Sequence, residues 1–187
     1  LKRRCDRWTR IALVAACGRH GSVLLEELVS AWTRRDKGRF QELRQLVGMI
    51  AETIGRKGDP REVTAALTMF DSVPGTSSAL LKVHLSGMAG LDAGLARGGR
   101  SLGDPPGDFG GQRLEAMWAR IIQWSVRPPE PAMGPVATKL LRSGPKAVAV
   151  PALIEQFDGG SVEALRSMAR FQDKAIGDVV LARYSGL

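Results

Sequence analysis

Apolar residues recur at helical spacing in one segment after another of this chain, and this repetition most strongly limits its fold. The clearest segment runs from Phe40 to Ile54, where the apolar positions share one helical face. The next has a strong start: Asp59 suits the N-cap, Pro60 suits the first turn, and Glu62 can reach back to the cap backbone. Along the whole chain the pattern predicts about ten helices, and long alternating β-branched runs are absent.

The breaks between these segments are mostly short and rich in glycine and proline. Short connections make consecutive helices antiparallel neighbours, and no segment is apolar all round. We therefore predict an all-α fold, a HEAT-like α-solenoid of irregular antiparallel helix pairs, in preference to a compact bundle. Residues 1–98 would form the first repeats, 99–111 a loop insertion and 112–187 the last repeats, in one continuous solenoid cut from a longer chain.

The expected insertion at 99–111 contains Gly103-Asp104-Pro105-Pro106-Gly107, which cannot be regular helix. We expect Leu102 and Phe109 to anchor its base and the tip, residues 104–108, to stay exposed. The acidic tip would then face a basic neighbour or this chain's own arginines. The alternative is a tolerated insertion between helix pairs.

The charge of the chain invites a nucleic-acid interpretation, because 27 Lys and Arg stand against 19 Asp and Glu, a net charge of +8. Several cations, however, follow an apolar helical segment, where they would face the negative end of a helix dipole. Antiparallel helices would divide these ends between two edges, so we favour solvated helix ends over one basic stripe. The pairs in question are Arg19 and His20, Arg34 and Arg35, Arg56 and Lys57, and Arg97 and Arg100.

No catalytic, cofactor-binding or metal-binding residue is expected in this segment. Cys17-Gly18-Arg19-His20 lacks the second thiol and the histidine spacing of a haem-attachment motif, and Cys5 and Cys17 are expected to be small buried residues. His20 and His84 stand in no zinc-binding pattern, and we expect His84 to be packed in or beside the core. Residues 98–101 lack the lysine and the preceding strand of a phosphate loop.

Tryptophan offers a second route to nucleic acid, through base stacking. Asp6 beside Trp8, or Glu115 beside Trp118, would supply the acid and the aromatic pocket of a DNA glycosylase relative. Core anchoring is the preferred interpretation of Trp8, Trp32 and Trp118, which fall in phase with apolar stripes, whereas Trp124 is expected to be exposed.

Three stretches of the chain together resemble a known family. Their residues are Asp6, Trp8, Arg10, Ala12 and Leu13; the segment from Ile54 to Gly58; and Gly90-Leu91 followed by Gly94 to Leu102. The region from Val150 to Tyr184 resembles a degenerate HEAT repeat. In this order the pieces are similar to the HEAT-like region of large planctomycete-type membrane-bound dehydrogenases fused to c-type cytochrome domains.

The resemblance implies a modular role. This segment would be a non-catalytic scaffold between a β-propeller dehydrogenase-like domain and a c-type cytochrome domain, so haem chemistry would lie in absent parts of the parent. Its partners would be neighbouring domains of the same polypeptide or another protein, in the periplasm or cell envelope. No apolar run is long enough to span a membrane. The alternative function is a basic HEAT-like nucleic-acid-binding module or a DNA glycosylase relative.

Overall fold

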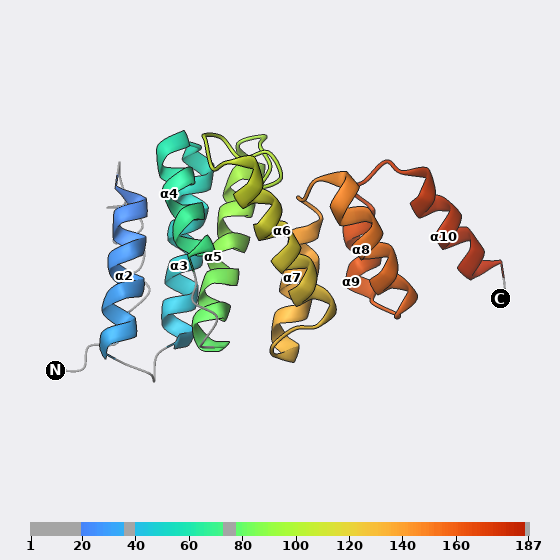
Figure 1. Ribbon diagram of the computed structural model, residues 1–187, viewed down its shortest axis with the longest axis horizontal. Helices are drawn as coiled ribbons and strands as arrows, with labels where there is room; N and C mark the ends of the chain where they lie inside the picture. Colours follow the sequence, from blue (N-terminus) through green and yellow to red (C-terminus); the bar gives the residue numbers. More distant parts are fainter. Residues whose placement is uncertain (1–19, 36–39, 73–77, 186–187) are drawn as a thin grey trace. The chain divides into compact units, whose positions relative to one another are not determined.

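The computed structural model describes residues 20–35, 40–72 and 78–185, and over these residues the chain is helical (Figure 1). This confirms the all-α class; in the described part the only β-type pairing is an isolated bridge between Ser101 and Asp104. The expected first helix, around Asp6, lies outside the described residues. The helices are α2 (Gly21–Arg35), α3 (Phe40–Lys57), α4 (Pro60–Asp71), α5 (Ser78–Arg97), α6 (Gly111–Val126), the 3-10 turn η1 (Pro131–Met133), α7 (Gly134–Leu141), α8 (Lys146–Asp158), α9 (Val162–Met168) and α10 (Lys174–Tyr184).

Contacts divide the chain into two compact units, Leu1–Arg113 and Leu114–Leu187. The first unit therefore contains the expected insertion at 99–111, and the division falls near the start of α6. Each unit has its own core, so each is described separately below.

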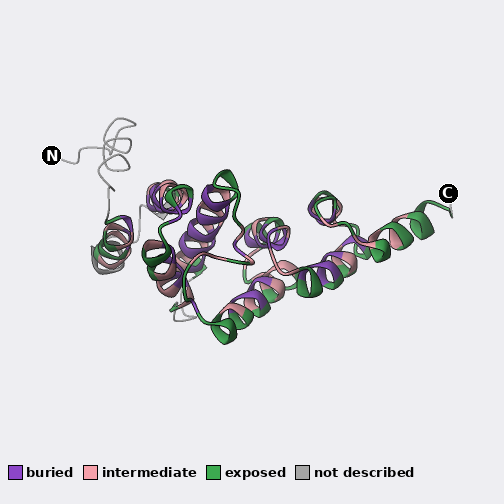
Figure 2. Ribbon diagram, turned by 90° about the horizontal axis from the view of Figure 1, so that it is seen from above, coloured by how far each residue is buried: buried purple, intermediate pink, exposed green. Residues whose placement is uncertain are grey.

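The first unit is built around α3 and α5, which run parallel because α4 returns the chain between them. Glycines let the two backbones touch. A Cβ on Gly90 would overlap the carbonyl oxygen of Gly48, and a Cβ on Gly94 would overlap that of Glu52. Figure 2 marks the buried residues of these helices in purple. Val47 and Ile50 of α3 and Leu91 and Leu95 of α5 are all fully buried in this unit.

The close approach of α5 also explains why α3 contains Gly55. The helix continues through Gly55 and ends at Lys57, before Gly58, whose φ is +63°. Gly55 is a packing position and not a stop, because a Cβ there would overlap Leu91 O of α5. The stop at Gly58 is the left-handed backbone that favours glycine after a helix.

The start of α4 is partly as expected. Asp59 Oδ1 accepts hydrogen bonds from Arg61 N at 2.9 Å and Glu62 N at 3.4 Å, which confirms the cap. The expected return of Glu62 to its own cap is wrong: its Oε2 accepts from Ser22 N of α2 at 2.7 Å. Ser22 was expected to cap α2, but that helix begins at Gly21. Glu62 therefore satisfies an unpaired N–H at the start of a neighbouring helix.

The loop between α5 and α6 has the anchors that the sequence predicts, because Leu102 is fully buried and Phe109 is 4% exposed. Its tip is only partly free: Asp104 and Asp108 are exposed, whereas Pro105 and Pro106 are half-buried. Gly107 rests on the first turn of α4, with φ +102°, and a Cβ there would approach Pro60 O within 2.6 Å. The loop is thus seated on α4 and not a free excursion.

The second unit packs α6 to α9 around a core that contains Trp118, Ile121, Leu141, Leu153 and Met168. Gly144 allows the turn after α7 to pack on the Trp118 ring, because a Cβ there would lie 3.1 Å from it. Pro151 lies inside α8 without ending it. α9 ends at Met168, three residues before the expected Phe171.

The last helix, α10, contributes no buried residue. Leu181 is 69% exposed and Tyr184 is 57% exposed. The burial colours of Figure 2 show the contrast with the helices before it, since the helix that ends at the C-terminus has no buried segment. Two polar contacts hold it to α8: Lys146 with Asp173 at one end and Arg183 with Asp158 at the other.

Candidate docking surfaces

The structure brings none of the considered chemical groups into a catalytic arrangement among its described residues. Cys5, Cys17, Asp6 and Trp8 lie outside the described part, as does the Trp32 side chain. Trp118 is 2% exposed, which confirms a core role, while Glu115 is exposed on the same helix. A buried indole cannot stack on a base, so the Glu115–Trp118 pocket is not formed. Trp124 is half-buried and not exposed as expected.

His84 is a core residue, as expected, at 4% exposed. Its ring stands edge-on to Phe70 with centroids 5.8 Å apart, and its Nδ1 lies 3.4 Å from Phe70 O. Burial lowers the pKa of His84, and the hydrogen bond to the Phe70 carbonyl opposes that shift only in part. The neutral ring therefore serves packing and has no access to substrate.

One cluster of cations lies at a single edge of the first unit. Because α3 and α5 are parallel, Arg56 and Lys57 end one helix at the same edge where Arg97 and Arg100 follow the other. We call these four residues the helix-end cluster. Arg97 pairs with Glu52 of α3, and Arg100 donates a hydrogen bond to Gly58 O, so both arginines also tie α5 to α3.

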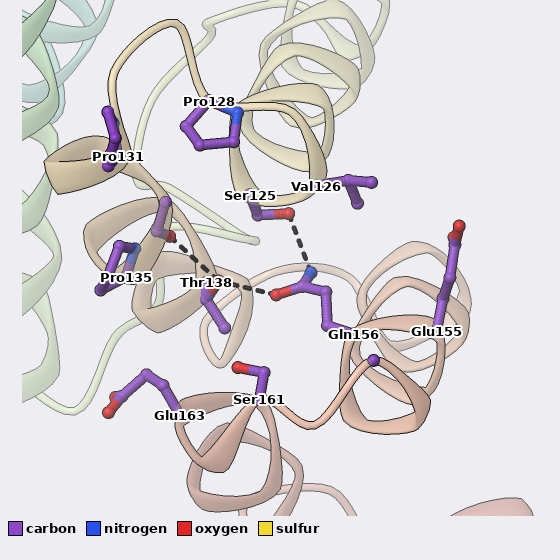
Figure 3. A pocket seen from close by; sticks show the side chains of 12 residues that line it. Ser125, Val126, Pro128, Pro131, Pro135, Thr138, Glu155, Gln156, Ser161 and Glu163 are labelled. Carbon is purple, nitrogen blue, oxygen red and sulfur yellow. Dashed lines mark hydrogen bonds between the residues drawn. The ribbon is translucent and has the colours of Figure 1, made fainter.

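The second unit contains a polar cavity of about 440 Å³ between the ends of α6, α7, α8 and α9 (Figure 3). Three side chains form a hydrogen-bonded relay across it. Gln156 Nε2 donates to Ser125 Oγ at 2.9 Å, and Thr138 Oγ1 donates to Gln156 Oε1 at 2.7 Å. Ser125 Oγ in turn donates to Ile122 O at 2.7 Å. The relay cross-links α6, α7 and α8.

The rim of the polar cavity is acidic and contains prolines. Glu155 and Glu163 lie on opposite sides of it in Figure 3, and Pro128, Pro131 and Pro135 line its wall. The sequence gives little sign of this site, because Ser125 and Gln156 are 31 residues apart and each looks like an ordinary helical position. A polar residue at each of several helix ends is the only pattern that could have pointed to it.

A second hollow lies beside α8 and the start of α10, with a volume of about 880 Å³. We call it the α10 groove. Its floor is apolar, formed by Ala147, Val150, Pro151 and Ile154 of α8. Ion-paired Lys146 and Asp173, 3.1 Å apart, mark one end. Exposed apolar residues on α10 extend the same kind of surface beyond the groove.

The described residues contain neither a metal-binding group nor a helix that could span a membrane. In residues 20–35, 40–72 and 78–185 no three His, Cys, Asp or Glu side chains come together as a metal site would require. No helix in those ranges is long and apolar enough to cross a membrane. The chain matches no known family model, no curated protein and no solved structure.

Proposed function

We propose that this chain is a HEAT-like helical scaffold, a non-catalytic docking module of a larger redox protein. In this role it connects a β-propeller dehydrogenase-like domain to a c-type cytochrome domain, in the periplasm or cell envelope. It needs no cofactor of its own, since the haem belongs to the neighbouring domain. The sequence resemblance supplies the identity of the neighbours, and the surface of α10 supports the docking role.

The observation that carries the proposal is the lack of any buried residue on α10. A helix stabilises a fold through the apolar face that it buries, and α10 buries little: none of its residues is fully buried, and Ile176, Val179 and Val180 are half-buried. Its Leu181 is 69% exposed, and the α10 groove at the start of the same helix has an apolar floor. Exposed apolar surface is typical of interaction sites. A helix stacked on α10, as in a solenoid, would cover it.

Binding to a haem-loaded c-type cytochrome domain of the resembled family tests the proposal. Calorimetric titration should show binding that Leu181→Glu and Ile154→Glu abolish. Val23→Glu is the matched control, because Val23 is 56% exposed on α2 of the other unit. Absence of binding by the unaltered chain, to both the cytochrome and the propeller domain, contradicts the proposed connection.

A basic nucleic-acid-binding module is the second candidate, and the helix-end cluster favours it. Parallel α3 and α5 place four cations at one edge, because the single helix α4 returns the chain between them. Glu52 neutralises one of them, and the acidic residues Asp104 and Asp108 belong to the loop seated on α4. The net excess of positive charge at this edge is therefore smaller than the total of the chain suggests.

Salt dependence separates the two candidates. Each phosphate contact contributes about −0.9 to the slope of log K against log salt on duplex DNA. If the helix-end cluster binds DNA, Arg56→Gln together with Lys57→Gln makes that slope less negative by about 2. The same pair of changes at Arg166 and Arg170, in the other unit, is the control. A slope that both double variants change equally indicates diffuse attraction to a basic chain and not a site.

A further inference from the structure

We propose that the polar cavity is a receptor for a guanidinium group, the side chain of an arginine presented by a docked protein partner. The inference rests on the proposed docking function, because the partner supplies the arginine. It is carried by what the cavity offers a ligand: acceptors, carboxylates and rigid apolar walls.

Three hydrogen-bond donors in the floor of the cavity are already engaged. The Ser125 hydroxyl donates to Ile122 O, the Thr138 hydroxyl to Gln156 Oε1, and the Gln156 amide to Ser125 Oγ. A hydroxyl has one proton to donate but two lone pairs, so its remaining capacity is to accept. The three wall prolines add no N–H groups. A ligand rich in donors is therefore favoured over one rich in acceptors.

The charges around the cavity also favour a ligand of this kind, one that is cationic. Glu155 and Glu163 stand on opposite sides of the opening (Figure 3). Helices α6 and α8 end here, at Val126 and Asp158, and helix C-termini have a partial negative charge. The positive ends of α7 and of the short α9 offset this in part. Arg127 lies between the lining residues Val126 and Pro128 and is exposed. Arg166 reaches Glu163 at 3.6 Å with 73% of its side chain exposed, so a ligand can displace it.

The shape of the site favours arginine over a smaller cation. Acceptors lie on more than one side of the cavity, and a guanidinium is planar with five donors that diverge in a fork. An ammonium is a compact, strongly hydrated charge that contacts fewer of them. The aliphatic stem of arginine can pack on Val126 and the proline wall.

Nuclear magnetic resonance with a small probe tests the site without the partner. Nα-acetyl-arginine amide, titrated into the ¹⁵N-labelled chain, should shift the Gln156 side-chain amide and the Ser161 backbone amide, with about millimolar affinity for so small a ligand. Nα-acetyl-citrulline amide is the matched neutral control and should bind at least tenfold more weakly. Nα-acetyl-lysine amide should fall between the two.

Charge-neutral variants complete the test. Glu163→Gln should weaken arginine binding several-fold, and Glu155→Gln with Glu163→Gln should abolish it. Glu115→Gln, an exposed position on α6 outside the cavity, should leave the affinity unchanged. Equal binding of citrulline and arginine, shifts that map elsewhere, or an unaltered affinity in the double variant would each overturn the proposal. An unaltered Gln156 shift pattern in the free variants shows that the cavity is still formed.

The two proposals fail in distinguishable ways. Leu181→Glu should abolish binding of the cytochrome domain and leave the probe affinity unchanged, since Leu181 does not line the cavity. Glu163 lines the cavity and not the α10 groove, so Glu163→Gln reports on the cavity alone. Probe binding without domain binding supports the cavity proposal and refutes the connector role. Domain binding without probe binding supports the connector role and refutes the cavity proposal.

Discussion

The two units of this molecule are held together by different means. In the first, α3 and α5 touch backbone to backbone through Gly48, Gly90 and Gly94, and a dry core lies along the contact. In the second, a polar relay that includes Gln156 joins the helix ends, and the last helix has no fully buried residue. Close backbone contact allows little adjustment, whereas exposed helices and polar relays tolerate change. The same substitution should therefore have different consequences in the two units.

The largest difference is expected for an aspartate in place of a leucine. Leu46 is 6% exposed in α3, so Leu46→Asp should destabilise by about 4 kcal/mol, through lost apolar burial and an unpaired buried carboxylate. Leu181→Asp, at 69% exposed in α10, should change stability by less than about 0.5 kcal/mol. Urea denaturation measures both. Similar losses in the two variants would mean that α10 is covered in solution.

Alanine in place of glycine should give effects of opposite sign. Gly94→Ala places a Cβ against the carbonyl of Glu52, so α5 must move away from α3, at a cost of about 1–3 kcal/mol or more. Gly177→Ala in α10 meets nothing within 4 Å and should strengthen that helix by up to about 1 kcal/mol. Thermal unfolding followed by circular dichroism distinguishes them. A stable Gly94→Ala protein would refute the close contact.

Removal of one polar side chain compares the relay with a surface ion pair. Gln156→Ala breaks two side-chain hydrogen bonds in a half-buried site and should cost about 1–3 kcal/mol. Glu52→Ala breaks the pair with Arg97, whose side chain is 60% exposed, and should cost at most about 1 kcal/mol. Chemical denaturation of both variants checks the order. A larger loss for Glu52 would reverse our view of which polar contacts hold the chain.

Helical periodicity was sufficient to predict most of the elements, because each helix buries one stripe and periodicity reports that stripe directly. Leu46, Leu102, Phe109 and Trp118 were all expected in the core, and the structure buries them. Periodicity does not report which helices run parallel. Arg56 and Arg97 share one edge because a single helix, α4, separates α3 from α5.

Glycine serves both at helix ends and at close helix contacts, and the sequence alone does not separate the two roles. Gly58 follows the end of α3 with a positive φ, whereas Gly55 sits inside α3 where the α5 backbone passes. Gly90 and Gly94, spaced one helical turn apart, were the available signal of a close helix contact. The polar cavity was beyond prediction, since its residues meet only through tertiary packing of four helices.

Between about pH 5.5 and pH 7.5 a pH dependence is expected in the first unit, because both histidines of the chain lie there. Burial lowers the pKa of His84 in the folded state, so the unfolded state binds protons more readily. The stabilisation is fully present above the unfolded pKa of about 6.5 and is lost as the pH falls below it.

The melting temperature should therefore drop by a few degrees from about pH 7.5 to about pH 5.5, and scanning calorimetry measures the drop. His84→Gln should remove it, while His20→Gln, at an exposed position, should leave it in place. Persistence of the drop in His84→Gln would assign it to carboxylates instead.

The smallest effect is expected from removing the helix caps, and it contrasts the units most directly. Asp59→Ala uncaps α4, whose Val63, Leu67 and Phe70 are buried, so the loss of about 1 kcal/mol should appear in global stability.

Asp173 caps α10 through Ala175 N at 2.8 Å and pairs with Lys146. The Ala175 N–H, with help from Lys146, lowers the pKa of Asp173, so this contact stabilises above the ordinary pKa and is lost as the pH falls through the lowered one. Because no residue of α10 is fully buried, its opening need not disturb the rest of the unit. Asp173→Ala should therefore speed amide exchange several-fold from Ile176 to Val180 and leave the melting temperature unchanged. A loss of unfolding free energy equal to that of Asp59→Ala would show that α10 unfolds together with the second unit and is not a separate docking surface.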